Sequence, residues 1–176
     1  MKPLKMTTFD SPVGNIIIGG DGESIYFVKM GELNARDEWI EKWRQKHDIA
    51  EPEFVDGAYS QAIDEFLRYF NGNLNQFSFE TTLLGTEFQK QVWKTLEEIP
   101  YGEQWTYKDI AKSIGNIKAL RAVGGAINKN PISIAIPCHR VIGSDGSLTG
   151  YASGLDHKRF LLHHETASEH WLHQTS

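Results

Sequence analysis

Internal disulfide bonds are excluded in this chain, because its 176 residues contain a single cysteine, Cys138. Long apolar runs are also missing, and no stretch approaches the roughly 18 residues that a membrane-spanning helix needs. The amino-terminal residues lack the basic and then apolar pattern of a secretion signal. A lone thiol suits a reducing compartment. We therefore expect a cytoplasmic protein without a membrane partner.

Metal ligands are sparse as well. The first half of the chain holds one histidine, His47, which is too little for a metal site. Four more histidines, His163, His164, His170 and His173, lie near the carboxyl end without a thiolate or a paired carboxylate set. Metal sites in proteins are built from such ligand sets. We therefore expect no metal ion.

Positive charge is in the minority over the whole chain but concentrated in one segment. The 18 basic residues face 23 acidic ones, which gives a net charge of -5. Residues 107–140, in contrast, hold six basic side chains and one acidic side chain, a local charge of +5. Such asymmetry favours one basic surface for a polyanion such as DNA. A solvated helix face is the alternative interpretation.

The first half of the sequence predicts a small α/β domain. Apolar stretches separated by turn residues predict an antiparallel meander, and helical spacing of aromatic and aliphatic residues predicts two helices. We expect strands over 4–10, 14–19 and 25–28, helices over 34–46 and 58–70, and a loop over 47–57. A linker-like stretch follows at 72–84, so we place the domains at 1–80 and 81–176.

The second half predicts four helices. Thr86 and Gln89 match a capping box at the start of a helix that Pro100 ends, and Thr106 can cap the next one. The expected helices after Thr106 span 107–114, 117–128 and 155–165. The pair joined by the turn at Gly115 has the outline of a helix-turn-helix. Its second helix contains Gly124 and Gly125, each of which costs about 1 kcal/mol relative to alanine. Either close packing or the approach of a nucleic-acid backbone would explain them.

The stretch around Cys138 leaves two interpretations open. The apolar run before it predicts a buried β segment, which Pro137 must end because proline has no amide hydrogen to donate. A thiol reacts as its thiolate, which nearby cations or bases favour, and His139 and Arg140 follow directly. Inert packing is the equal alternative, since cysteine is often simply buried. In a strand, His139 would point away from Cys138, so contact needs a bend or a bridging water.

Several motifs together resemble one family. Pro137–Arg140, preceded by Arg121–Ala126 and Asn130–Pro131 and followed by Gly154–Leu155, closely resembles the O6-alkylguanine-DNA alkyltransferases (methylated-DNA–protein-cysteine methyltransferases) from about residue 85 to 165. The resemblance implies an α/β protein with an N-terminal ribonuclease-H-like α/β domain and a C-terminal winged-helix-like (helix-turn-helix) domain. It implies a DNA repair protein that flips a damaged base from the duplex.

The same resemblance implies a reaction and its residues. The alkyl group of O6-alkylguanine in double-stranded DNA passes irreversibly to the cysteine, once per molecule and without a cofactor, with O4-alkylthymine as a second candidate substrate. Cys138 is the expected acceptor, and His139 takes its proton through a water molecule. Glu165 orients His139, and Tyr107 gives a proton to the leaving guanine. We expect the protein to act as a monomer.

Further residues are expected to bind DNA or the flipped base. Arg121 matches the arginine that fills the vacated position in the base stack, and Asn130 resembles a hinge residue. The other expected contacts are Gly124, Gly125, Arg140, Tyr151 and Ser153. Ala152 and Ser153 depart from the serine and glycine of many members, which affects the lip of the base pocket. The competing interpretations are a thiol hydrolase, which leaves the basic helices unexplained, and a DNA-binding module without chemistry, which leaves Cys138 unexplained.

Overall fold

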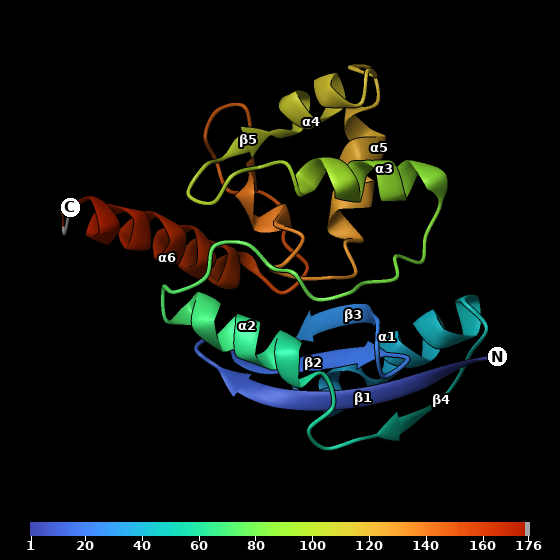
Figure 1. Ribbon diagram of the computed structural model, residues 1–176. Helices are drawn as coiled ribbons and strands as arrows, with labels where there is room; N and C mark the ends of the chain where they lie inside the picture. The colour runs from blue at the N-terminus through green and yellow to red at the C-terminus, as the bar shows by residue number, and fades with distance from the viewer. Residues whose placement is uncertain (175–176) are drawn as a thin grey trace. The chain divides into compact units, whose positions relative to one another are not determined.

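The computed structural model describes the backbone of residues 1–174 and the side chains of residues 1–167. The chain forms two compact units, Met1–Leu84 and Gly85–Ser176 (Figure 1). All of the site residues predicted from the sequence belong to the second unit.

The first unit is a four-stranded sheet with two helices. Its elements are β1 (Lys2–Ser11), β2 (Gly14–Gly20), β3 (Ile25–Met30), α1 (Leu33–Lys46), β4 (Ile49–Phe54) and α2 (Ser60–Phe70). The strand order is β3-β2-β1-β4, and β2 pairs antiparallel with both of its neighbours. The predicted meander and both predicted helices are therefore confirmed.

The predicted loop at 47–57 is wrong, because β4 lies there and pairs in parallel with β1. Pro52 cannot donate to a ladder, and the last four residues of β4 are exposed, so the sequence shows neither alternation nor a buried run. An edge strand tolerates both features, since only one of its sides is paired.

Alternate residues of β1 pack against different helices. Leu4 and Met6 belong to a buried cluster with Ile40 and Trp43 of α1. Phe9 instead contacts Phe66 of α2, with ring centroids 5.8 Å apart. Because successive side chains of a strand point to opposite faces, α1 and α2 cover opposite faces of the sheet.

The second unit is mainly helical. Its elements are α3 (Glu87–Leu96), β5 (Trp105–Thr106), α4 (Tyr107–Ser113), α5 (Leu120–Asn128), a 3-10 helix η1 (Cys138–Arg140), β6 (Val141–Ile142) and α6 (Leu155–Gln174). Strands β5 and β6 pair in parallel. The capping box that begins α3 is confirmed, and Thr106 caps α4 through the amide of Asp109. Helix α3 ends at Leu96, before the predicted stop at Pro100.

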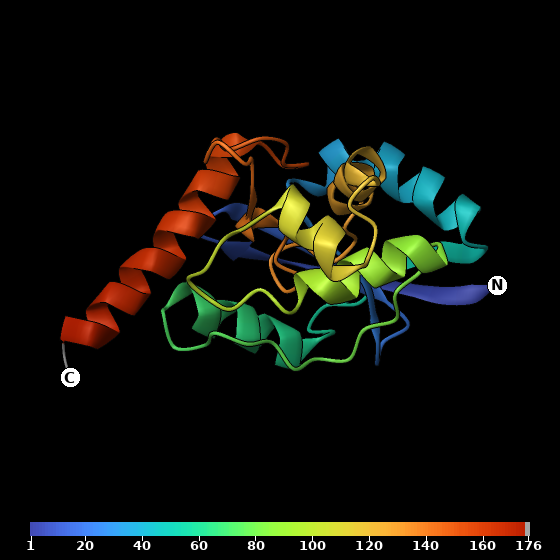
Figure 2. The same ribbon diagram turned by 90° about the horizontal axis from the view of Figure 1, so that it is seen from above.

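Two helices differ from their predicted lengths. Helix α5 begins at Leu120 instead of residue 117, because the amide of Ala119 donates to the carbonyl of Asn116 and closes a turn first. Helix α6 continues to Gln174 and does not end near Glu165. Neither glycine nor proline follows Glu165 in the sequence, so no stop signal interrupts the helix. Figure 2 shows α6 as one long rod.

Candidate active site

Cys138 lies in a buried turn region and not at the end of a strand. The residues before it form turns, in which the amide of Ile136 donates to the carbonyl of Ile132 and the amide of Cys138 to that of Ile136. Ile134 adopts a left-handed conformation with φ of 73°. The prediction of a β segment is therefore wrong. Isoleucines at 132, 134 and 136 are all buried. The apolar run therefore marks a buried segment, but that segment is a turn and not a strand.

Asn130 takes over the hydrogen bonding that a neighbouring strand would supply. Its side-chain amide donates to the carbonyl of Ile136 at 2.7 Å, and its side-chain oxygen accepts from the amide of Ile132 at 3.0 Å. All three residues are buried. Asn130 thus clamps the two ends of the turn that leads into Cys138 and connects that turn to the end of α5.

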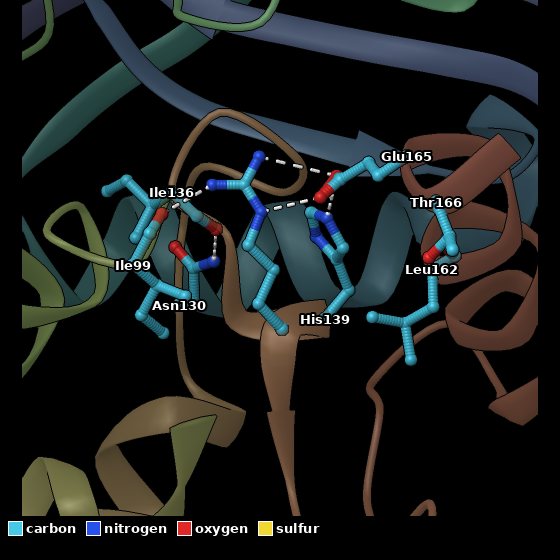
Figure 3. A network of polar contacts seen from close by, with 8 residues as sticks. Ile99, Asn130, Ile136, His139, Leu162, Glu165 and Thr166 are labelled. Atoms are coloured by element: carbon cyan, nitrogen blue, oxygen red, sulfur yellow. Dashed lines mark hydrogen bonds and ion pairs between the residues drawn. The ribbon is translucent and has the colours of Figure 1, made fainter. Parts of the chain in front are cut away.

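His139 and Glu165 form a buried pair. His139 Nε2 lies 2.6 Å from Glu165 Oε2, and the two side chains are 0% and 1% exposed (Figure 3). Burial would raise the pKa of Glu165, but the charges and hydrogen bonds of His139 and Arg140 outweigh it and lower the pKa to about 2. Glu165 is therefore a carboxylate that only accepts hydrogen bonds.

The ionised carboxylate fixes the tautomer of His139. Burial lowers the pKa of His139, against the raising effect of Glu165, and so favours the neutral ring. A neutral ring carries one proton, and the contact with the acceptor Glu165 assigns it to Nε2. The lone pair is then on Nδ1, which is buried and has no hydrogen-bond partner among the residues that the structure describes. Nδ1 is the atom of this pair that can accept a proton.

Arg140 belongs to the same network, contrary to the expectation that it contacts DNA. Its Nε donates to Glu165 Oε1 at 2.6 Å, and one terminal nitrogen donates to the carbonyl of Ile99 at 2.7 Å. The residue is 6% exposed. The sequence shows a cation beside Cys138 but not where its side chain points. A cation in a basic segment normally points to solvent, which is why a contact with DNA was expected. In the structure, Arg140 neutralises Glu165.

The loop after β6 carries Tyr151, which interacts with the thiol, and contacts Tyr107 of α4. The hydroxyl of Tyr107, at the start of α4, donates to the carbonyl of Thr149 at 3.0 Å. Burial raises the pKa of Tyr151 well above 10, and negative charge on Cys138 adds to the effect. Tyr151 therefore stays a neutral phenol close to the thiol. Ser153 is partly buried in the same loop, and Ala152 is exposed.

Lys158 of α6 is a site residue that the sequence analysis missed. Its side chain is fully buried, and its Nζ donates to the carbonyl oxygens of Val141 and Thr149. Burial lowers the pKa of Lys158, whereas negative charge on Cys138 raises it. The only signal in the sequence was a lysine near the apolar positions of a helix, which usually reaches solvent.

The predicted helix pair presents most of the basic segment to solvent. Trp93 of α3 holds α5 in place by donating from Nε1 to the carbonyl of Ala126 at 2.8 Å. The buried side of α5 consists of Val123, Ala126 and Ile127, and Arg121 is exposed. The other exposed cations of the segment are Lys108, Lys112, Lys118 and Lys129.

The two glycines of α5 are not required by packing within the protein. A Cβ atom built on Gly124 or Gly125 would meet nothing within 4 Å beyond the neighbouring backbone of its own helix. Of the two explanations that the sequence left open, close packing against another element of the chain is therefore excluded within the described residues. The glycines leave a bare strip of backbone on α5.

Two kinds of feature are absent among the residues that the structure describes, a metal-binding set and a membrane-spanning helix. No group of three or more His, Cys, Asp or Glu side chains lies together as a metal-binding set. The side chains of His170 and His173 lie outside the described part of the chain. No helix in residues 1–174 is long and apolar enough to cross a membrane.

Comparison with known proteins identifies the family. Residues 4–83 match the ribonuclease-like domain of 6-O-methylguanine DNA methyltransferase, and residues 87–167 match the DNA-binding domain of the same family. A methylated-DNA–protein-cysteine methyltransferase of Methanosarcina acetivorans is 48% identical over 88% of this chain and 93% of its own length. That of Haemophilus influenzae is 42% identical over 92% and 86%.

A solved structure gives the same result. The crystal structure of Mycobacterium tuberculosis OGT in complex with DNA is 41% identical to this chain, covers 93% of it and 94% of its own length, and has a TM-score of 0.82. The predicted fold class, an α/β protein with a ribonuclease-like and a DNA-binding half, is thereby confirmed. The chain belongs to the 6-O-methylguanine DNA methyltransferase family, the methylated-DNA–protein-cysteine methyltransferases.

Proposed function

We propose that this protein repairs DNA by transferring the alkyl group of O6-alkylguanine to the sulfur of Cys138. The observation that carries the proposal is the buried pair of Glu165 and His139, the residue that directly follows the only cysteine, with the proton of the ring held on Nε2. This leaves Nδ1 to take the thiol proton, through a bridging water as the resemblance implies. Nucleophile, base and orienting carboxylate are the usual components of an activated thiol site.

The proposed reaction is a single displacement. The thiolate sulfur forms a bond to the alkyl carbon, while the bond between that carbon and O6 of guanine breaks and its electron pair goes to the base. The leaving guanine then takes a proton, which we assign to Tyr107. Cys138 ends as a thioether, and no described residue offers a route to reverse that bond. Each molecule therefore acts once.

Access to the alkyl group requires the base to leave the duplex, at a cost of a few kcal/mol. Family membership and the DNA complex of the related Mycobacterium tuberculosis protein support DNA as the partner. We propose that α5 approaches the DNA backbone along its bare glycine strip and that exposed Arg121 fills the position of the flipped base. Contacts of this kind position the protein and read little sequence.

The proposal also assigns roles to the base pocket and to the two domains. We propose that Tyr151 and Ser153 line the pocket for the flipped base, that the first domain is structural, and that the second binds DNA and accepts the alkyl group. We also propose a monomer that acts in the cytoplasm. O4-alkylthymine stays a predicted second substrate.

Mass spectrometry tests the acceptor. After incubation with duplex DNA that contains O6-methylguanine, the protein should gain the mass of one methyl group, and Cys138→Ser should gain none. A steady release of product from a thioester substrate would favour a thiol hydrolase instead. Bound DNA with unchanged protein mass would show a DNA-binding module without alkyl transfer.

Gly125→Ala should change stability and duplex repair in opposite directions. The added methyl group meets open space and removes the helix penalty of glycine, so the free energy of unfolding should rise by up to about 1 kcal/mol. The same methyl group would separate α5 from a DNA backbone. Single-turnover rates should therefore fall several-fold on alkylated duplex DNA and stay unchanged with free O6-benzylguanine.

Arg121→Ala is the comparison variant for this experiment. It removes an exposed side chain, so it should lower duplex repair without changing stability or the reaction with the free base. If Gly125→Ala is more stable but repairs duplex DNA at the wild-type rate, α5 does not approach DNA closely at Gly125.

A further inference from the structure

The hydroxyl of Tyr107, to which the proposed reaction assigns the proton for the leaving guanine, lies against the loop after β6. This hydroxyl donates to the carbonyl of Thr149 at 3.0 Å. A Cβ atom built on Gly150 would lie 3.7 Å from the same hydroxyl oxygen. The phenol oxygen is therefore close to the backbone at Thr149 and Gly150.

The small parallel sheet of the second unit brings this loop to Tyr107. Thr106 of β5 pairs with Ile142 of β6. Tyr107 directly follows β5, and the loop directly follows β6. Because the two strands are parallel, the chain leaves both of them at the same end of the sheet. The amide of Gly143 then donates to the carbonyl of Ser147, and this turn sends the loop back towards the phenol.

The hydrogen bond that Tyr107 makes in the structure does not suit the state that follows proton transfer. A carbonyl oxygen only accepts hydrogen bonds. Once the phenol has given its proton to the base, the phenolate oxygen and the carbonyl oxygen of Thr149 are both acceptors. In the positions that the structure gives them, these two oxygens are 3.0 Å apart. The phenolate therefore needs a hydrogen-bond donor.

The side chain of Thr149 supplies such a donor. Its Oγ1 lies 3.5 Å from the hydroxyl oxygen of Tyr107 and donates to it. At that length the bond to a neutral phenol is weak. Hydrogen bonds to an ionised acceptor are shorter and roughly twice as strong, so this contact should strengthen as the phenolate forms. Thr149 thus offers the phenol an acceptor, its carbonyl, and the phenolate a donor, its hydroxyl.

We propose that Thr149 is a positioning residue for proton transfer: its carbonyl holds the Tyr107 hydroxyl before the reaction, and its hydroxyl stabilises the phenolate. The inference rests on the proposed role of Tyr107. In this step the O–H bond of the phenol breaks, its electron pair stays on oxygen, and an N–H bond forms on a ring nitrogen of the leaving guanine. The proton of Oγ1 stays on Thr149. The phenolate then takes a proton from water.

Thr149→Val tests the hydroxyl, because it keeps the backbone carbonyl and the approximate shape of the side chain. Thr149 is exposed, so the melting temperature should not change. The single-turnover rate with free O6-benzylguanine should fall about tenfold, the loss expected for one hydrogen bond to a charged group. Thr149→Ser keeps the hydroxyl and should restore most of the wild-type rate. A wild-type rate in Thr149→Val, or a loss that Thr149→Ser does not restore, would refute the proposal.

Tyr107→Phe separates this role from a general effect of Thr149 on the loop. The variant forms no phenolate, so adding Thr149→Val to it should cause no further loss of rate. Iodoacetamide alkylates Cys138 without a guanine leaving group, so Thr149→Val should react with it at the wild-type rate. Additive losses in the double variant, or slower reaction with iodoacetamide, would mean that Thr149 does not act through Tyr107 and would overturn the inference.

The same variants distinguish failure of this inference from failure of the proposed function. If Tyr107→Phe reacts with O6-benzylguanine at the wild-type rate, Tyr107 gives no proton to the base, and the roles of Tyr107 and Thr149 fail together. If Tyr107→Phe is slow but Thr149→Val is not, only the role of Thr149 fails. The methyl gain on Cys138 tests the acceptor and depends on neither result.

Discussion

Glu165→Gln is expected to lose most of the alkyl-transfer activity and a large part of the stability of the second unit. The change keeps the shape of the side chain but leaves the buried guanidinium of Arg140 without a carboxylate, and it removes the anion that fixes the His139 tautomer. Breaking a buried ion pair on one side costs about 3 to 5 kcal/mol. Loss of a positioned general base lowers a rate about 100-fold or more.

Thermal unfolding and single-turnover transfer from free O6-benzylguanine measure the two effects. Glu98→Gln is the matched control, because it makes the same change at an exposed carboxylate. It should behave like the wild type in both assays. A Glu165→Gln protein that melts and reacts like the wild type would show that Arg140 and His139 do not depend on this carboxylate.

The same pair sets the acid sensitivity of the wild-type protein. The pKa of Glu165 falls from 4.5 in the unfolded chain to about 2 in the folded one, so its contribution is complete above pH 4.5 and disappears as the pH falls towards 2. The shift corresponds to about 3 kcal/mol. His139 also makes the folded protein less stable in acid. Its pKa is lower in the folded chain than in the unfolded chain, so a falling pH protonates the unfolded chain first. Urea unfolding of Glu165→Gln should therefore depend less on pH below 4.5.

The elements that depend on a few adjacent residues, such as capped helices and tight turns, were predicted correctly. Thr86 with Gln89, and Thr106 before its helix, give capping patterns that depend on a few adjacent residues, and both helices begin there. The meander likewise follows from alternation and turn residues. The motif around Cys138 pointed to the part of the chain in which His139 and Arg140 contact Glu165, since family resemblance compares positions and needs no geometry.

The parts that were missed depend on contacts between distant residues. The apolar run before Cys138 is equally compatible with a strand and with a buried turn, and the hydrogen bonds of Asn130 decide between them. The sequence assigns Arg140 to the basic surface, but its partner in the structure is Glu165, 25 residues later in the chain. The burial of Lys158 could not be predicted, because its partners are backbone carbonyls, which any residue type supplies.

The clamp made by Asn130 is the second place where one substitution should have a large effect. Asn130→Ala leaves the carbonyl of Ile136 and the amide of Ile132 buried without their side-chain partner. The amide of Ile132 is left unsatisfied, at a cost of about 1 to 3 kcal/mol. The carbonyl of Ile136 keeps the amide of Cys138 and loses one hydrogen bond of about 1 kcal/mol, so the total loss should be about 2 to 4 kcal/mol. For a chain of this size, the melting temperature should fall by roughly 10 °C.

Asn128→Ala is the matched control, because Asn128 is an exposed asparagine at the end of α5, two residues before Asn130. It should leave the melting temperature unchanged. In Asn130→Ala, iodoacetamide should label Cys138 faster than in the wild type at low denaturant, because the left-handed turn at Ile134 is no longer held at both ends. Unchanged labelling together with a lower melting temperature would mean that Asn130 stabilises the unit without positioning the thiol. Faster labelling with slower alkyl transfer would show that the reaction depends on where the turn holds Cys138, and not only on its exposure.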